Sequence, residues 1–163
     1  MRRTASILGA AGLAAACVAG LGGAAKQQPL TPAQAAIAAH YTNNDPAWVI
    51  LRDTAVTADR AKGLLTAAFG PRTRVLAGKP FTISGFMSPL EASGDTRHFI
   101  VTRRSTTCPF CPPNEPTEAV EVFTTAPVRM TDAEVVVSGR MELTASSDEG
   151  LFYRLRDAAQ VRR

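Results

Sequence analysis

The stretch FIVTRRSTTCPFCPPNEPTEAVEV, residues 99–122, places two cysteines in a proline-rich loop between two segments that alternate apolar and polar residues. Phe99 and Val101 share one face before the loop, and Val120 and Val122 share one face after it. A period of two is typical of strands buried on one side only. The stretch therefore predicts two neighbouring strands joined by the chemically most distinctive loop of the chain.

Three further segments alternate in the same way, at residues 80–88, 134–144 and 151–157. Gly85 and Gly139 lie inside two of them and predict bends or bulges, which help a sheet to close on itself. Five such strands in about eighty residues are typical of small all-β domains. The sequence thus predicts a mainly β fold, a small antiparallel five-stranded OB-like barrel with a short N-terminal helical appendage.

The N-terminal half of the chain carries weaker signals. Thr31 as N-cap and Pro32 as first helical residue predict a short helix, propagated by the alanines that follow. Residues 48–51 resemble a short strand, and residues 59–69 a single weak helix. The expected domains are an appendage or linker at 26–46, an OB-like barrel at 47–157 and a C-terminal tail at 158–163.

The first 25 residues have the order of parts found in a signal peptide. A basic start with Arg2 and Arg3 precedes an apolar run at 7–21 and small residues at 22–25. We expect cleavage after residue 25 and an exported, periplasmic protein. Two alternatives stay open: a lipoprotein anchored to the membrane through Cys17, or an uncleaved N-terminal anchor.

Composition argues against a nucleic-acid partner. The formal net charge is +4, two of these charges belong to the signal peptide, and aromatic residues make up 6% of the chain. Nucleic-acid binding needs a clustered basic face, with aromatic rings that stack on the bases of single strands. The chain also lacks a glycine-rich phosphate loop and the short motifs of common hydrolases.

Several segments together resemble an uncharacterised family, a domain of unknown function found in secreted bacterial proteins. The resemblance covers about residues 48–157, and its most specific parts are LAGKPFTISGFMSPL at 76–90 and the cysteine loop with Asn114. It implies an OB-like barrel, export and, in some relatives, a link to envelope transport and metal homeostasis. Many relatives have Cys-x-His in the loop, whereas this chain has Cys108-Pro-Phe-Cys111.

The pair Cys108 and Cys111 has several interpretations. Cleavage after residue 25 would remove Cys17 and leave these two of the three cysteines in an exported protein, which favours a disulfide between them. Two thiolates could instead hold a zinc or copper ion with His98 as a further ligand, although His98 also fits a solvent-exposed strand end. A thioredoxin-like redox pair needs a helix beginning at the cysteines, and the proline at 112 disfavours one. That proline also excludes a haem-attachment motif, which needs histidine there.

These observations favour a non-enzymatic exported accessory or binding protein of the cell envelope that displays the Cys-x-x-Cys loop. Its partner would be an envelope transport protein or a metal ion. The alternative is a thiol–disulfide oxidoreductase that uses Cys108 and Cys111. Glu115 and Glu118 flank the loop, and we expect both carboxylates to be solvated.

Overall fold

The computed structural model describes residues 29–90 and 94–161. The predicted signal peptide, its cleavage site and Cys17 lie outside the described residues. The elements in chain order are α1 (Pro32–His40), α2 (Pro46–Leu51), β1 (Thr54–Asp59), β2 (Leu64–Phe69), α3 (Pro71–Arg74), β3 (Pro80–Pro89), β4 (Asp95–Thr102), the 3-10 turn η1 (Pro116–Glu118), β5 (Ala119–Arg129), β6 (Glu134–Leu143), β7 (Ser146–Ser147) and β8 (Tyr153–Val161).

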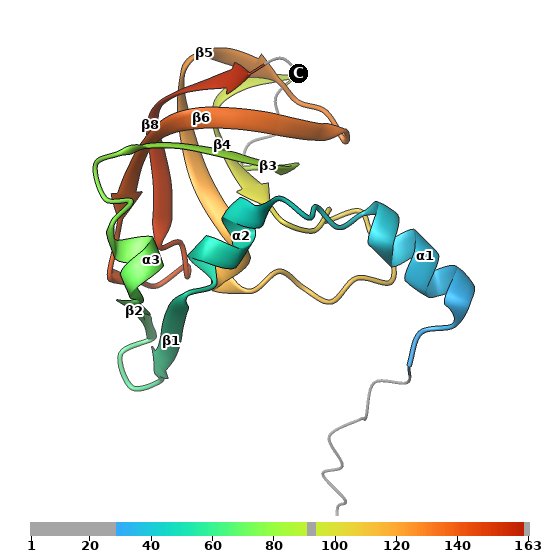
Figure 1. Cartoon of the computed structure of the whole chain (residues 1–163), viewed down its shortest axis with the longest axis horizontal. Coiled ribbons are helices and arrows are strands. Elements are labelled where there is room, and N and C mark those ends of the chain that lie inside the picture. The colour runs from blue at the N-terminus through green and yellow to red at the C-terminus, as the bar shows by residue number, and fades with distance from the viewer. Residues whose placement is uncertain (1–28, 91–93, 162–163) are drawn as a thin grey trace, which may run out of the picture.

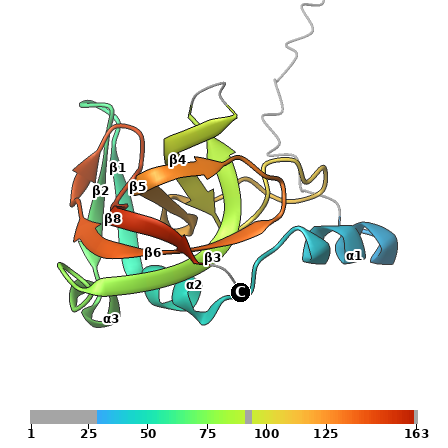
Figure 2. The ribbon, with the colours of Figure 1, turned by 90° about the horizontal axis from the view of Figure 1, so that it is seen from above.

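Five strands close into a barrel in the order β3-β4-β5-β8-β6, which confirms the predicted small β-barrel (Figures 1 and 2). Four of the neighbouring pairs are antiparallel, but β5 and β8 run parallel. The prediction of an antiparallel barrel is therefore wrong at this pair. The reason is topological, because a closed ring with an odd number of strands cannot alternate direction at every neighbour.

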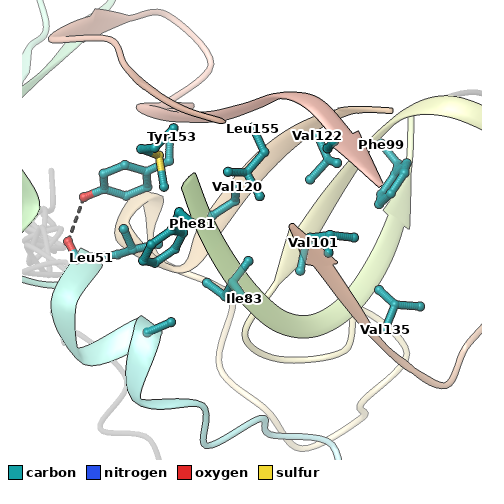
Figure 3. Close-up of a cluster of buried hydrophobic side chains, with 14 of the residues drawn as sticks. Leu51, Phe81, Ile83, Phe99, Val101, Val120, Val122, Val135, Tyr153 and Leu155 are labelled. Carbon is teal, nitrogen blue, oxygen red and sulfur yellow. Dashed lines mark hydrogen bonds between the residues drawn. The ribbon is translucent and has the colours of Figure 1, made fainter. Parts of the chain in front are cut away.

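Alternation along the strands fills the barrel with apolar side chains. Phe99, Val101, Val120, Val122 and Leu155 are fully buried, and Figure 3 shows them pointing toward one another from β4, β5 and β8. Burying one large apolar side chain contributes about 1.5–3 kcal/mol. The inward residues inferred from the sequence between positions 99 and 122 are thus core residues.

The segment at 48–51, predicted as a strand, is instead part of helix α2. The carboxylate of Asp45 caps it by accepting a hydrogen bond from the backbone N–H of Ala47, and Pro46 is its first residue. Trp48 and Leu51 are buried against the barrel core. The short apolar run fitted either element. Asp45 and Pro46 permit a helix start here, and burial of Trp48 and Leu51 on the barrel core favours the helix over the strand.

The predicted helix at 59–69 is wrong as well. This segment contributes to a hairpin of β1 and β2, which forms a second, three-stranded sheet with β7. Val56, Leu65 and Phe69 pack against the barrel core from this hairpin. Tertiary burial here outweighs the weak helical preference of the segment.

The two ends of the described chain differ in their packing. Helix α1 forms as predicted, with a capping box between Thr31 and Gln34, and none of its residues is buried. It extends away from the barrel in both views (Figures 1 and 2). Strand β8 begins two residues later than expected and runs to Val161, so residues 158–161 are strand rather than tail. No helix among the described residues combines the length and apolarity needed to span a bilayer.

The two glycines expected at bends lie where strands approach closely. A Cβ at Gly85 would stand 2.5 Å from the carbonyl oxygen of Thr102, and one at Gly139 would stand 2.8 Å from that of Arg156. The register of β6 against β8 shifts at Gly139, whereas β3 pairs with β6 in continuous register through Gly85. Of these two glycines, Gly139 marks a bulge and Gly85 does not.

Candidate functional site

The cysteine loop, defined here as residues 105–116, connects β4 to η1 and β5. Cys108 and Cys111 are joined by a disulfide within it, as predicted, with their Cα atoms 5.5 Å apart. Both cysteines are half-buried, and Pro109 between them is exposed. No helix occurs between residues 105 and 115, so neither cysteine lies at a helix N-terminus.

The neck of the loop is closed by Asn114. Its side-chain oxygen accepts a hydrogen bond from the backbone N–H of Arg104, and its side-chain nitrogen donates to the carbonyl oxygen of Arg104, both at 2.8 Å. The Arg104 guanidinium also donates to the carbonyl oxygen of Pro113 at 3.0 Å. The two ends of the loop are therefore joined to each other independently of the disulfide.

Glu118 holds the base of the loop through its contacts with Arg104. Its side chain is 2% exposed, and the guanidinium of Arg104 donates to both of its carboxylate oxygens. Arg103 donates to Oε1 at 2.9 Å, and a nitrogen of Arg52 lies 3.9 Å from the same oxygen. Removing one partner of such a buried charge group typically costs about 3–5 kcal/mol.

The expectation that Glu118 is solvated is thus wrong, whereas Glu115 is exposed. The two residues form a capping box, in which the Glu115 carboxylate accepts from the Glu118 backbone N–H and the Glu118 carboxylate accepts from that of Glu115. The sequence Glu-Pro-Thr-Glu at 115–118 contains the signal for this capping box. Pro116 is at the first helical position, and Glu118 is at the third, where a capping box has an acidic residue. The signal was missed because the turn is only three residues long.

The segment before α2 packs along the loop. The backbone N–H of Ser105 donates to the carbonyl oxygen of Tyr41 at 3.0 Å, and Thr42 forms a β-bridge with Arg104. The sulfur of Cys111 lies 3.7 Å from the carbonyl oxygen of Ala38 in α1. The loop and the exposed helix α1 therefore form one continuous surface.

The same N-terminal segment is tied to the barrel through Ser84 of β3. Asp45 accepts hydrogen bonds from both the backbone N–H and the hydroxyl of Ser84 at 2.9 Å. The side chain of Asn43 donates to the Ser84 hydroxyl, and the Trp48 indole donates to the Ser84 carbonyl oxygen. Sequence reasoning identified none of these contacts, because the partners lie about forty positions apart.

His98 lies on the outer face of the barrel and takes no part in the cysteine loop. Its Nε2 is 2.8 Å from Oε1 of Glu121, and its ring stacks on Phe123 with centroids 4.2 Å apart. The guanidinium carbon of Arg156 lies 3.9 Å from the same ring centroid. Two groups this close to one centroid must cover opposite faces of the ring, so Phe123 offers no free face for stacking a ligand.

Glu121 is the charged centre of this outer cluster. Burial raises the pKa of its carboxyl group, but hydrogen bonds from Arg154 and His98 outweigh burial and lower the pKa below its usual value. The Arg154 Nε donates to Oε2 of Glu121 at 2.6 Å. His98 therefore belongs to a hydrogen-bonded cluster on the outer face of the barrel, centred on the ion pair of Glu121 with Arg154.

The predicted metal ligands are not brought together. Cys108 and Cys111 share a disulfide and His98 pairs with Glu121. Within residues 29–90 and 94–161, no three His, Cys, Asp or Glu side chains are grouped so that they could hold a metal ion. The residues present therefore do not fit a zinc or copper site.

A shallow pocket of about 350 Å³ lies away from the loop, between β3, β6 and β8. Its lining includes Pro80, Gly139 and the ion pair of Arg140 with Asp157, whose nearest atoms are 3.1 Å apart. Both charged side chains are more than half exposed. The pocket has no buried polar group that would orient a ligand.

Comparisons with known proteins give little beyond this geometry. No family model matches the chain, and no curated protein matches it. A crystal structure of a DUF3299 family protein from Pseudomonas aeruginosa is similar, with 24% sequence identity and a TM-score of 0.44. The similarity covers 60% of this chain and 68% of that chain. At this TM-score the likeness carries no conclusion about family or activity.

Proposed function

We propose that the chain is a non-enzymatic binding protein of the cell envelope and that the cysteine loop is the element it presents to its partner. The supporting observation is that the loop is fixed twice, by the Cys108–Cys111 disulfide and by the Asn114 neck. A loop already held in one conformation loses little conformational entropy on binding, which favours affinity.

A catalytic role for the cysteines finds less support. The attacking cysteine of a redox pair is activated by a lowered pKa, often at a helix N-terminus, and neither Cys108 nor Cys111 occupies such a position. The second candidate function is nevertheless a thiol–disulfide oxidoreductase. One observation favours it, namely that both cysteines are only half-buried and so within reach of a second thiol.

The proposal has three further parts, which concern export, the binding partner and metal handling. The signal-peptide pattern at 1–25 supports a periplasmic protein, or a membrane-anchored one if Cys17 is lipidated. The partner would be an envelope transport protein. Metal handling would require Cys108 and Cys111 to be reduced, with further ligands supplied by that partner, because thiolates and not disulfides bind zinc or copper.

The deciding experiment is a measurement of the reduction potential of the Cys108–Cys111 pair. The purified protein is equilibrated in glutathione and dithiothreitol buffers and the free thiols are counted. A structural bridge should have a potential below about −300 mV, whereas thiol–disulfide enzymes lie between about −270 and −120 mV. A value in the enzymatic range, together with turnover of a disulfide substrate, would overturn the binding-protein proposal.

A second experiment tests presentation of the loop. A photo-crosslinking residue replaces the exposed Pro109 at the loop tip, or the exposed Val75 beside α3 as a matched control. We expect a discrete cross-linked envelope protein from position 109 and none from position 75. The intact mass of the same preparation reports whether residues 1–25 are removed or whether Cys17 carries acyl chains.

A further inference from the structure

Three guanidinium groups converge on Glu118, but a carboxylate carries only one negative charge. Arg104 donates to both oxygens and is the principal partner of this carboxylate. Arg103 shares Oε1 at 2.9 Å, and Arg52 reaches the same oxygen only at 3.9 Å. One carboxylate therefore faces three cations, which leaves a local excess of positive charge.

Within residues 29–90 and 94–161, no acidic side chain other than Glu118 forms an ion pair with Arg52 or Arg103. Asp53 is adjacent to Arg52 in sequence, but its carboxylate pairs with Arg72. The Glu115 carboxylate lies at the edge of the cluster, where it is exposed and accepts the Glu118 backbone N–H.

Burial makes the unbalanced charge costly. The Arg103 and Arg104 side chains are only 19% and 12% exposed, and Nε of Arg104 is buried without an acceptor. Burying a charge without a partner costs free energy, so a nearby anion would stabilise this arrangement. Arg52 is 42% exposed, which leaves its guanidinium open to solvent and to a ligand.

We propose that Arg52 and Arg103 bind an oxyanion, either a carboxylate or a phosphate group, beside the base of the cysteine loop. Both guanidinium groups lie within 4 Å of one oxygen of Glu118, so a single anion can contact both. The planar fork of arginine binds carboxylate and phosphate oxygens in pairs. This site goes beyond the binding role of the loop and stands independently of it.

The test is a titration of the purified chain at constant ionic strength with two probes, inorganic phosphate and an acetylated tetraglutamate peptide. Binding is followed by calorimetry and by the thermal unfolding midpoint. We expect saturable binding of at least one probe, weakened about tenfold by Arg52→Gln, since a charge-assisted hydrogen bond is worth at least that factor. Arg52→Lys keeps the charge without the fork and should have an intermediate affinity.

Arg60→Gln is the matched control, because Arg60 is exposed in the turn between β1 and β2 and its loss changes the net charge equally. Its affinity should stay within about twofold of the wild type, since surface charges act weakly at a distance in salt. Saturable binding of phosphate would identify a free anion as the ligand. Saturable binding of the peptide alone would identify the carboxylates of a protein partner as the ligand.

Two results would overturn the site: no saturable binding of either probe, or equal weakening by Arg52→Gln and Arg60→Gln. Because Arg52 is substantially exposed, Arg52→Gln should fold normally, and its circular dichroism and unfolding midpoint without probe verify this. Neither result bears on the reduction potential of Cys108 and Cys111, so failure here is distinguishable from failure of the binding-protein proposal.

Discussion

The side chain of Asn114 pairs with the backbone of Arg104 as a neighbouring β-strand would. It accepts from the Arg104 N–H and donates to the Arg104 carbonyl oxygen, each at 2.8 Å. One amide side chain thus pairs with both backbone groups of Arg104, two residues after β4 ends and before β5 begins. This pairing determines where the cysteine loop starts and finishes.

Replacing Asn114 should loosen the loop without unfolding the barrel. Asn114→Ala leaves the backbone N–H of Arg104 without its acceptor, which costs about 1–3 kcal/mol, whereas the Arg104 carbonyl oxygen still accepts from the Thr102 hydroxyl at 2.8 Å. Hydrogen exchange of the amides at 105–113 should accelerate more than exchange in β4 and β5. Asn44→Ala, at an exposed position, serves as control. Equal exchange in both variants would show that the disulfide alone orders the loop.

Gly139→Val should destabilise the barrel. A Cβ at this position would stand 2.8 Å from the carbonyl oxygen of Arg156 and 2.9 Å from the Cβ of Ala158. Relieving such overpacking costs about 1–3 kcal/mol, measurable as a lower midpoint in urea. Gly94→Val is the comparison, since a Cβ there meets nothing within 4 Å. Equal midpoints for the two variants would rule out a close approach at Gly139.

The stability of the fold should depend on Tyr153 at alkaline pH. Its hydroxyl donates to the carbonyl oxygen of Leu51, the dashed contact in Figure 3, and burial raises its pKa to about 12. The pKa of a tyrosine is about 10 in the unfolded chain. The contribution of the neutral Tyr153 hydroxyl to the free energy of unfolding is therefore complete below pH 10 and is lost as pH rises toward 12.

The comparison with Tyr153→Phe isolates this effect. The variant lacks the hydroxyl, so it should be less stable than the wild type at pH 8. The difference should shrink above pH 10 by about 1.4 kcal/mol per pH unit, because only the wild type releases this proton on unfolding. Urea unfolding at pH 8, 10 and 11 measures it. A difference that stays constant across these values would contradict the raised pKa.

Protein purified from the envelope without reductant should contain no free thiol at Cys108 or Cys111 after denaturation. The double variant Cys108→Ser, Cys111→Ser should lose no more than about 2 kcal/mol of stability, because the bridge closes a very short loop and removes little chain entropy. Thiol titration and urea unfolding measure the two quantities. If the titration finds two free thiols together with stoichiometric zinc or copper, the disulfide is wrong and the two cysteines form a metal site.

Local patterns in the sequence were enough to locate the strands of the barrel and helix α1. Alternation placed Phe99, Val101, Val120 and Val122 in the core, since a strand exposes successive side chains to opposite faces regardless of its neighbours. The cap at Thr31 acts within one turn of helix and needs no tertiary partner. The two cysteines, three positions apart, were likewise close enough to pair through local geometry.

Tertiary structure decided what depends on distant partners. Residues 48–51 became helix because Trp48 and Leu51 cover the barrel core, and 59–69 contributed a strand pair because Phe69 packs on that core. Glu118 was expected to be solvated, yet arginines from three positions surround it and make its burial possible. A charge is buried only where partners compensate its desolvation, and those partners include Arg52, 66 positions away in the chain. The parallel β5–β8 pair has the same origin, since strand direction follows from closing the ring and not from any single strand.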